Sequence, residues 1–155
     1  MDNMNENFLR LENQLCFPLY AAARETIKVY KPFLDELDLT YTQYIAMLLL
    51  WEHNTLTVKG MGDRLFLDSG TLTPLLKKLE AKGLITRTRS TKDERNLNVT
   101  ITEQGMALRE KAEHIPEDIG KNNPLSLEET MTLYRLLYKL LGIEGLYTPD
   151  WPFLN

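Results

Sequence analysis

The fold of this chain is decided by the stretch DSGTLTPLLKKLEAKGLITRTR, residues 68–89. Its first half carries leucines at 72, 75, 76 and 79, the i, i+3, i+4, i+7 spacing of one buried helix face. Asp68 and Ser69 offer N-caps for that helix, and Gly83 is a C-terminal stop. After Gly83 apolar and polar residues alternate, which predicts a strand. Opposite the leucines, the helix presents small hydroxyl and basic side chains.

The flanking segments complete a winged helix-turn-helix. Thr57 can cap a short helix through Leu65, just before the helix that follows Asp68. Residues 97–101 alternate like 84–89, and the polar loop 90–96 between them predicts a β-hairpin. In such an arrangement the second helix enters the major groove of DNA, and the hairpin tip can reach the adjacent minor groove.

The rest of the chain has helical periodicity, so the predicted fold class is mainly α with a small β-hairpin wing. Pro18 should kink the first helix or mark its true start, and Pro32 should end or bend it. Pro74 is tolerable only near a helix start. The other predicted helices cover 42–53, a charged segment from Thr102 toward Ile115 that Pro116 and Gly120 interrupt, and a segment through Leu141 that Ser126 and Glu129 open as a capping box.

Composition limits the kind of protein. The chain has 155 residues, enough for one domain with its own core. Cys16 is the single cysteine, so no disulfide can form within the chain. The longest apolar run, 45–51, is too short to cross a bilayer, and the N-terminus lacks the apolar region of a signal peptide. We therefore expect a cytoplasmic protein with no membrane partner.

The net charge of −4 hides an uneven distribution. Residues 59–95 hold nine Lys and Arg against five Asp and Glu, a net +4, so the remainder carries −8. A basic middle third in an acidic protein is a sign of nucleic-acid contact, although short basic excesses are also common on solvated surfaces.

Four segments resemble the signature of MarR-type winged-helix repressors: residues 68–80, 83–87, 93–95 and 100–105. The resemblance covers roughly Leu11 to Leu141. It implies a homodimer, joined through the terminal helices, that reads a pseudo-palindromic double-stranded DNA operator. It implies a single domain over 1–155, with a dimerisation and sensor scaffold in 8–53 and 103–141, a winged lobe in 57–102, and an aromatic tail of unassigned role in 142–155.

The same resemblance assigns the DNA-contacting residues. Those that match the recognition helix are Ser69, Thr71, Thr73, Lys77 and Lys78. Arg95 matches the wing arginine, and Asp93 is expected to orient it through a charge-assisted hydrogen bond.

Cys16 has two interpretations. A lone cysteine is usually a small hydrophobic residue. Tyr20, however, lies four residues on along the same helix face, and phenolic hydroxyls can donate hydrogen bonds to a thiolate. Residues 11–17, Tyr20, 30–32, Tyr41, 43–44 and 50–52 closely resemble the organic hydroperoxide resistance regulators, a branch of the MarR type.

In that branch the cysteine senses peroxide, so the resemblance implies that Cys16 is the sensor and that Tyr20 and Tyr30 hold it across the dimer interface. Oxidation by an organic hydroperoxide would give a sulfenic acid, followed by a mixed disulfide with a low-molecular-weight thiol, a cyclic sulfenamide or further oxidation. The tyrosine contacts would break, the lobes would rotate, and DNA would be released.

Three alternatives stay open at this point. A MarR-type repressor could answer to a small aromatic ligand, with Cys16 structural. A one-cysteine thiol peroxidase lacks support, because no βαβ pattern surrounds Cys16. A helical interaction protein that binds no DNA is the third. We expect no enzyme activity, cofactor or metal site, since His53 and His114 are isolated and the glycines form no phosphate loop.

Overall fold

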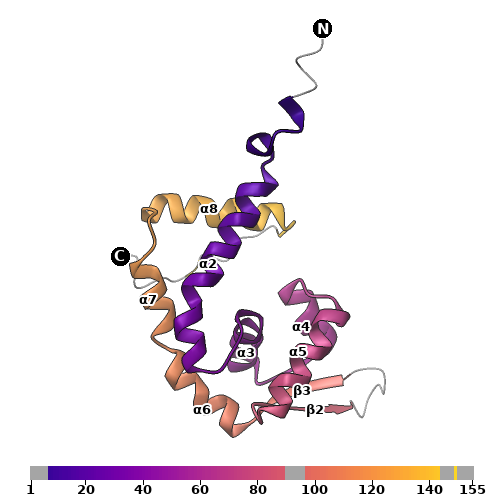
Figure 1. Cartoon of the computed structure of the whole chain (residues 1–155). Helices are drawn as coiled ribbons and strands as arrows, with labels where there is room; N and C mark the ends of the chain where they lie inside the picture. Colours follow the sequence, from indigo (N-terminus) through magenta and orange to yellow (C-terminus); the bar gives the residue numbers. More distant parts are fainter. Residues whose placement is uncertain (1–6, 90–96, 144–148, 150–155) are drawn as a thin grey trace. The chain divides into compact units, whose positions relative to one another are not determined.

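The computed structural model describes residues 7–89, 97–143 and 149, and its chain divides into two compact units, Met1–Ala112 and Glu113–Asn155 (Figure 1). The elements of the first unit are η1 (Leu11–Asn13), α2 (Cys16–Glu36), α3 (Tyr41–His53), β1 (Thr55–Thr57), α4 (Val58–Leu65), α5 (Ser69–Ala81), β2 (Ile85–Arg89), β3 (Leu97–Ile101) and α6 (Glu103–Ala112). Those of the second are α7 (Ile115–Lys121) and α8 (Leu127–Leu140). The predicted fold class is confirmed.

The sheet has a strand that the sequence did not predict. Its order is β1-β3-β2, and both pairings are antiparallel. Val99 in the middle strand pairs with Arg87 of β2 on one side and Leu56 of β1 on the other. β1 has only three residues, too few for alternation to be visible in the sequence. It forms because β3 offers it a free edge.

Local signals set the helix ends around the winged lobe. The Thr57 hydroxyl accepts from the Gly60 N–H at 3.0 Å and caps α4, as predicted. Asp68 caps α5 through the Thr71 N–H. After α5, Gly83 has φ +73°, a left-handed conformation that suits glycine, and it stops the helix where predicted.

Pro32 does not end the first helix, and Pro74 does not stand near a helix start. Both lie inside helices, Pro32 in α2 and Pro74 in α5. The other predicted outcome for Pro32, a bend of the helix, stays a prediction. An interior proline costs about 3 kcal/mol. Beyond Pro32, the chain buries Leu34 and Leu37, and a buried leucine contributes about 1.5–3 kcal/mol. The leucines on both sides of Pro74 are buried in the same way. Pro18, by contrast, lies in the first turn of α2 and marks its start, one of the two predicted outcomes.

The core of the first unit is built from α3, α5 and the sheet. Met47, Leu50, Leu76 and Leu79 are fully or almost fully buried. The Trp51 indole N–H donates to the Gly105 carbonyl at 2.9 Å and ties α6 to α3. A Cβ at Gly105 would lie 2.1 Å from the Leu84 carbonyl oxygen, so only glycine permits this approach. Among the described residues, no helix is long and apolar enough to cross a membrane.

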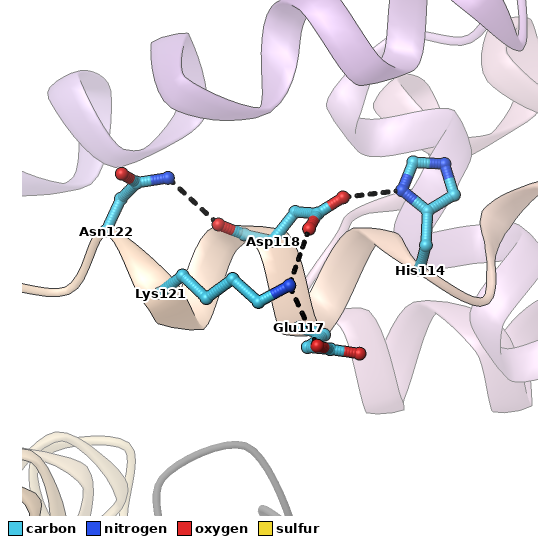
Figure 2. Close-up of polar contacts among 5 residues, drawn as sticks. All are labelled: His114, Glu117, Asp118, Lys121 and Asn122. Atoms are coloured by element: carbon cyan, nitrogen blue, oxygen red, sulfur yellow. Dashed lines mark hydrogen bonds and ion pairs between the residues drawn. The ribbon is translucent and has the colours of Figure 1, made fainter.

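In the second unit, an ion-pair network follows the short helix α7 (Figure 2). His114 Nδ1 and Asp118 Oδ2 lie 2.8 Å apart, and Lys121 Nζ lies 2.8 Å from Glu117 Oε1 and 3.3 Å from Asp118 Oδ1. Hydrogen bonds from His114 and Lys121 lower the pKa of Asp118. His114 thus pairs with Asp118, and in the described part of the chain no group of three or more His, Cys, Asp or Glu side chains is arranged to hold a metal ion. The helix itself begins with Pro116 in its first turn, so Pro116 opens α7 and the predicted charged helix ends earlier, at Ala112.

Candidate DNA-binding surface and redox site

The exposed face of α5 carries the residues predicted to contact DNA. Ser69, Thr71, Lys77 and Lys78 are exposed and Thr73 is half-buried. Beneath them the predicted leucine stripe is buried, at Leu72, Leu75, Leu76 and Leu79. The helix therefore presents its hydroxyl and ammonium groups outward because its apolar face is fixed in the core. Their contact with DNA stays a prediction.

Asp68 holds Thr71 at the start of this face. Its carboxylate accepts from the Thr71 N–H at 2.9 Å and from the Thr71 hydroxyl at 3.1 Å. These hydrogen bonds lower the pKa of Asp68, because they stabilise its charged form. The Thr71 hydroxyl thus gives its hydrogen to Asp68 and is left as an acceptor.

The predicted residues lie beside two different grooves. Ser69 and Thr73 line a groove of about 510 Å³ between α4, α5 and the strands of the wing, together with Lys59, Arg87 and Leu97. A second groove, of about 700 Å³, is lined by Lys78 with residues of the α2–α3 turn and of the ends of α3 and α5. There Lys82 binds Asp38, with Nζ 2.9 Å from Oδ2.

Glu80 and Arg87 connect the end of α5 to β2, a contact that the sequence did not predict. Arg87 Nη2 and Nε donate to Glu80 Oε2 at 2.6 and 3.0 Å, and the Arg87 backbone N–H donates to Oε1 at 3.1 Å. The guanidinium holds the pKa of Glu80 below its usual range. A spacing of seven residues across a turn carries no signal for such a pair, because the turn geometry alone decides it.

Asp93 and Arg95, the residues predicted for the wing tip, lie outside the described residues. Their role stays a prediction. The described part of the wing consists of β2 and β3, paired from Ile85 opposite Ile101 to Arg89 opposite Leu97.

Cys16, the predicted sensor, is the first residue of α2 and is exposed. The N–H groups of a first helical turn have no partner within the helix, and they favour an anion there. Tyr20 follows on the same face and is 59% exposed. Arg24 Nη1 donates to the Tyr20 hydroxyl at 3.1 Å, and its guanidinium lies 5.5 Å from the ring centroid. Arg24 therefore fixes Tyr20 while the phenolic hydrogen is left for another acceptor.

Tyr30, the other predicted partner, lies far from Cys16 in the same chain. The two residues are 14 positions apart on one continuous helix, which is about 21 Å at a rise of 1.5 Å per residue. The sequence resemblance placed the tyrosines across a dimer interface, and the helix geometry rules out a Cys16–Tyr30 contact within one chain.

Tyr30 instead belongs to an aromatic cluster. Its ring centroid lies 5.1 Å from Tyr41 and 5.9 Å from Tyr44, and Tyr44 in turn lies 6.2 Å from Trp51. Burial raises the pKa of Tyr30 and Tyr41, and it raises that of Tyr44 to about 12. All three phenols are therefore protonated donors at neutral pH. Chemically, the site offers an exposed thiol at the start of α2 and, further along the same helix, the half-buried phenolic donor of Tyr30.

Comparison with known proteins decides the family. The family model described as transcriptional regulator SarA/Rot matches residues 28–112. The organic hydroperoxide resistance transcriptional regulator of Bacillus subtilis is 57% identical over 133 residues, 86% of this chain and 90% of that protein. The chain belongs to the MarR-type winged-helix transcriptional regulators, in the organic hydroperoxide resistance branch. Members of this family are DNA-binding regulators and not enzymes, as the sequence predicted.

Solved MarR-type structures share the fold. Reduced AbfR bound to DNA is 36% identical, with a TM-score of 0.74 over 90% of this chain and 97% of that one. AbfR, from Staphylococcus epidermidis, is also known overoxidised and bound to DNA, with a TM-score of 0.73, and in a disulfide form, with a TM-score of 0.62. A MarR mutant from E. coli in complex with operator DNA is 26% identical, with a TM-score of 0.73 over 82% of this chain and 93% of that one.

Proposed function

We propose that this MarR-type regulator is a redox-sensing repressor that binds a pseudo-palindromic operator as a homodimer. Oxidation of Cys16 by an organic hydroperoxide releases the DNA. The observation that carries the proposal is an exposed Cys16 at the first turn of α2, in a chain 57% identical to an organic hydroperoxide resistance regulator.

The dimer is supported by apolar side chains that this chain leaves uncovered. In α2 they are Phe17, Leu19, Tyr20, Ile27 and Val29. In α8 they are Leu127, Leu133, Leu136 and Leu140. Large apolar side chains exposed in such number are a sign of a protein interface. We propose that a second copy covers α2 and supplies its own Tyr30 to Cys16, a contact that the helix length forbids within one chain.

The hydroperoxide is itself the oxidant of Cys16, so the reaction needs no metal or cofactor. The Cys16 thiolate attacks the terminal oxygen of the hydroperoxide, an S–O bond forms, and the O–O bond breaks. The leaving alkoxide takes a proton and departs as an alcohol, and Cys16 is left as a sulfenic acid. A low-molecular-weight thiol then displaces water from the sulfenic acid and gives a mixed disulfide.

A mixed disulfide is the product we propose to release DNA. It adds a bulky group at Cys16, whereas a sulfinic or sulfonic acid adds only oxygen atoms. The AbfR structures support this difference, because overoxidised AbfR is bound to DNA, and the disulfide form is the least similar of these AbfR structures to this chain. The bulky group would displace the partner's tyrosines and change the spacing of the two α5 helices.

The test is a titration of operator DNA by fluorescence anisotropy. The probe is a duplex of about 30 base pairs, three helical turns, selected by the reduced protein from a random library. Cumene hydroperoxide with free cysteine should weaken binding about 10- to 100-fold, the usual range of coupling between sites. Mass spectrometry should find one cysteine added at Cys16, and Cys16→Ser should bind the duplex and ignore the oxidant.

Two results would contradict the proposal. Loss of DNA binding by Cys16→Ser on treatment with peroxide would place the sensor elsewhere. Unchanged operator affinity of wild-type protein that carries the mixed disulfide at Cys16 would separate DNA binding from redox state. In either case the regulator that answers to a small aromatic ligand becomes the better description.

A further inference from the structure

The groove between α5 and the wing lies where a winged helix meets the DNA backbone. Figure 1 shows β2 and β3 extending beside α5. When α5 enters the major groove and the hairpin reaches the adjacent minor groove, the phosphate strand that separates the two grooves runs between them. The polar residues that line the 510 Å³ groove at this position are Lys59, Asp63, Asp68, Ser69, Thr73 and Arg87. The Asp68 carboxylate already accepts hydrogen bonds from Thr71 as the cap of α5.

We propose that Arg87 binds the DNA phosphate that passes through this groove, and that Glu80 is the residue that positions Arg87 for the contact. The inference rests on the DNA binding proposed above and adds a phosphate contact from β2 to the residues of α5. It is carried by the geometry of the Glu80–Arg87 pair and by the place of Arg87 in the groove wall.

Glu80 takes only part of the hydrogen-bonding capacity of Arg87. A guanidinium has five N–H donors, and Glu80 accepts from Nε and Nη2. Among the described residues, none accepts a hydrogen bond from Arg87 Nη1. The Arg87 side chain is 18% exposed, so it is held in one place and still reaches the groove. A phosphate oxygen is the acceptor that suits the remaining donors of an arginine.

Both residues of the Glu80–Arg87 pair also lie next to buried residues of the core. Glu80 lies in the last turn of α5, directly after the buried Leu79, and Arg87 pairs with the buried Val99 in the sheet. The backbone N–H of Arg87 binds the same carboxylate as its side chain. The Arg87 guanidinium is therefore held in a defined position relative to both α5 and β2.

The variant Glu80→Gln separates two possible roles of Glu80 in DNA binding, because a residue that positions Arg87 and a residue that acts only through its negative charge predict opposite changes in DNA affinity. Removing a negative charge beside DNA should tighten binding if only the local potential matters. If Glu80 orients Arg87, the same substitution should weaken binding. A neutral amide oxygen holds the guanidinium more weakly than a carboxylate does, and the amide NH2 cannot accept from the Arg87 backbone N–H. The sign of the change separates the two roles.

The experiment measures the dissociation constant of the reduced dimer for the selected duplex, and for a scrambled duplex, at a series of salt concentrations. One phosphate contact contributes about 0.9 to the slope of log K against log salt, so two copies of Arg87→Gln should lower the slope by about 1.8. The affinity should fall about 30-fold at physiological salt, equally for both duplexes, because a phosphate contact carries no sequence information.

Three further variants complete the test. Arg87→Lys should restore most of the slope and only part of the affinity, since a lysine keeps the charge without the fork. Glu80→Gln should weaken binding. The control is Lys28→Gln, which removes a cation that is also ion-paired, to Glu25 in α2, and should leave the slope unchanged. Thermal unfolding of each variant confirms that binding is measured on folded protein.

The inference is overturned if Arg87→Gln has the same slope of log K against log salt as the wild type. It is also overturned if Glu80→Gln binds the duplex more tightly than the wild type. A loss limited to the selected duplex also overturns it, because it would indicate a base contact. If the wild type itself binds neither duplex with a salt-dependent affinity, the proposed function fails first, so the two failures are distinguishable.

Discussion

At the residue scale, Phe66 shows how the helix-turn-helix is closed. It is the C-cap of α4, with φ 54° and ψ 38°, the left-handed conformation. A bulky side chain rarely adopts this conformation, which glycine adopts without strain. Phe66 is also 56% exposed, so little burial offsets the strain. The turn keeps this shape because the Leu67 N–H binds the Gly62 carbonyl at 3.0 Å and the next residue already caps α5.

Replacing Phe66 should therefore separate strain from side-chain contacts. Phe66→Gly should be more stable than Phe66→Ala by about 1 kcal/mol, since both lose the ring and only glycine relieves the backbone. Urea unfolding followed by circular dichroism measures the difference. Equal stability of the two variants would mean that the left-handed turn is not strained in this protein.

At the redox site, the sequence predicted the principal residues but not the contacts around them. The resemblance named Cys16, Tyr20 and Tyr30, and the structure places them on one helix. It did not name Arg24, which binds the Tyr20 hydroxyl, or give Tyr41 and Tyr44 their place around Tyr30. These contacts depend on side-chain directions and on the packing of α2 against α3, which no spacing in the sequence encodes.

At the element scale, helix starts were predictable and helix interiors were not. The caps Thr57, Asp68 and Ser126 each act on the N–H group three residues further on, so a short sequence pattern is sufficient. The effect of Pro32 and Pro74 depends on what the following residues bury, which is a property of the folded chain. β1 was missed for a similar reason, because its partner β3 lies more than forty residues away in the sequence.

The cap of α5 makes a prediction about pH. Thr71 hydrogen bonds lower the folded pKa of Asp68 below its ordinary 3.8. The charged carboxylate therefore stabilises the fold above that ordinary value, and this contribution is lost as pH falls through the lower, folded pKa. Asp68→Asn keeps a capping oxygen but does not titrate. Wild type should be the more stable at neutral pH, and the difference should shrink in strong acid.

Urea midpoints of the two proteins, compared at each pH, give this difference directly. The matched control is Asp63→Asn on α4, a carboxylate that caps no helix. A stability difference between wild type and Asp68→Asn that is the same in acid and at neutral pH would contradict the role of the charged cap.

At the scale of the whole molecule, the exposed apolar side chains predict that the protein forms a dimer. On α8, Leu133, Leu136 and Leu140 follow one another at i, i+3 and i+7, and all are exposed. Leu136→Glu places a charge in the middle of this stripe. It should give a monomer in analytical ultracentrifugation and weaken operator binding, because one lobe reads only one half-site.

The control for the dimer is Arg135→Glu, which places the same side chain at an exposed position of the same helix, about 100° round its axis from Leu136 and away from the stripe. It should leave the dimer and its DNA affinity unchanged. A Leu136→Glu protein that sediments as a dimer and binds the operator like the wild type would show that α8 lies outside the interface.

The sequence by itself determined the winged helix-turn-helix, the face of α5 that is presented to solvent and the identity of the one oxidisable thiol. It could do so because periodicity, caps and residue counts are local properties. Only the tertiary structure decided that Glu80 holds Arg87 beside the groove, that Pro32 and Pro74 stay inside helices, and that Tyr30 is out of reach of Cys16 in its own chain. Each of these depends on distances between residues that packing, and not neighbouring sequence, brings together or holds apart.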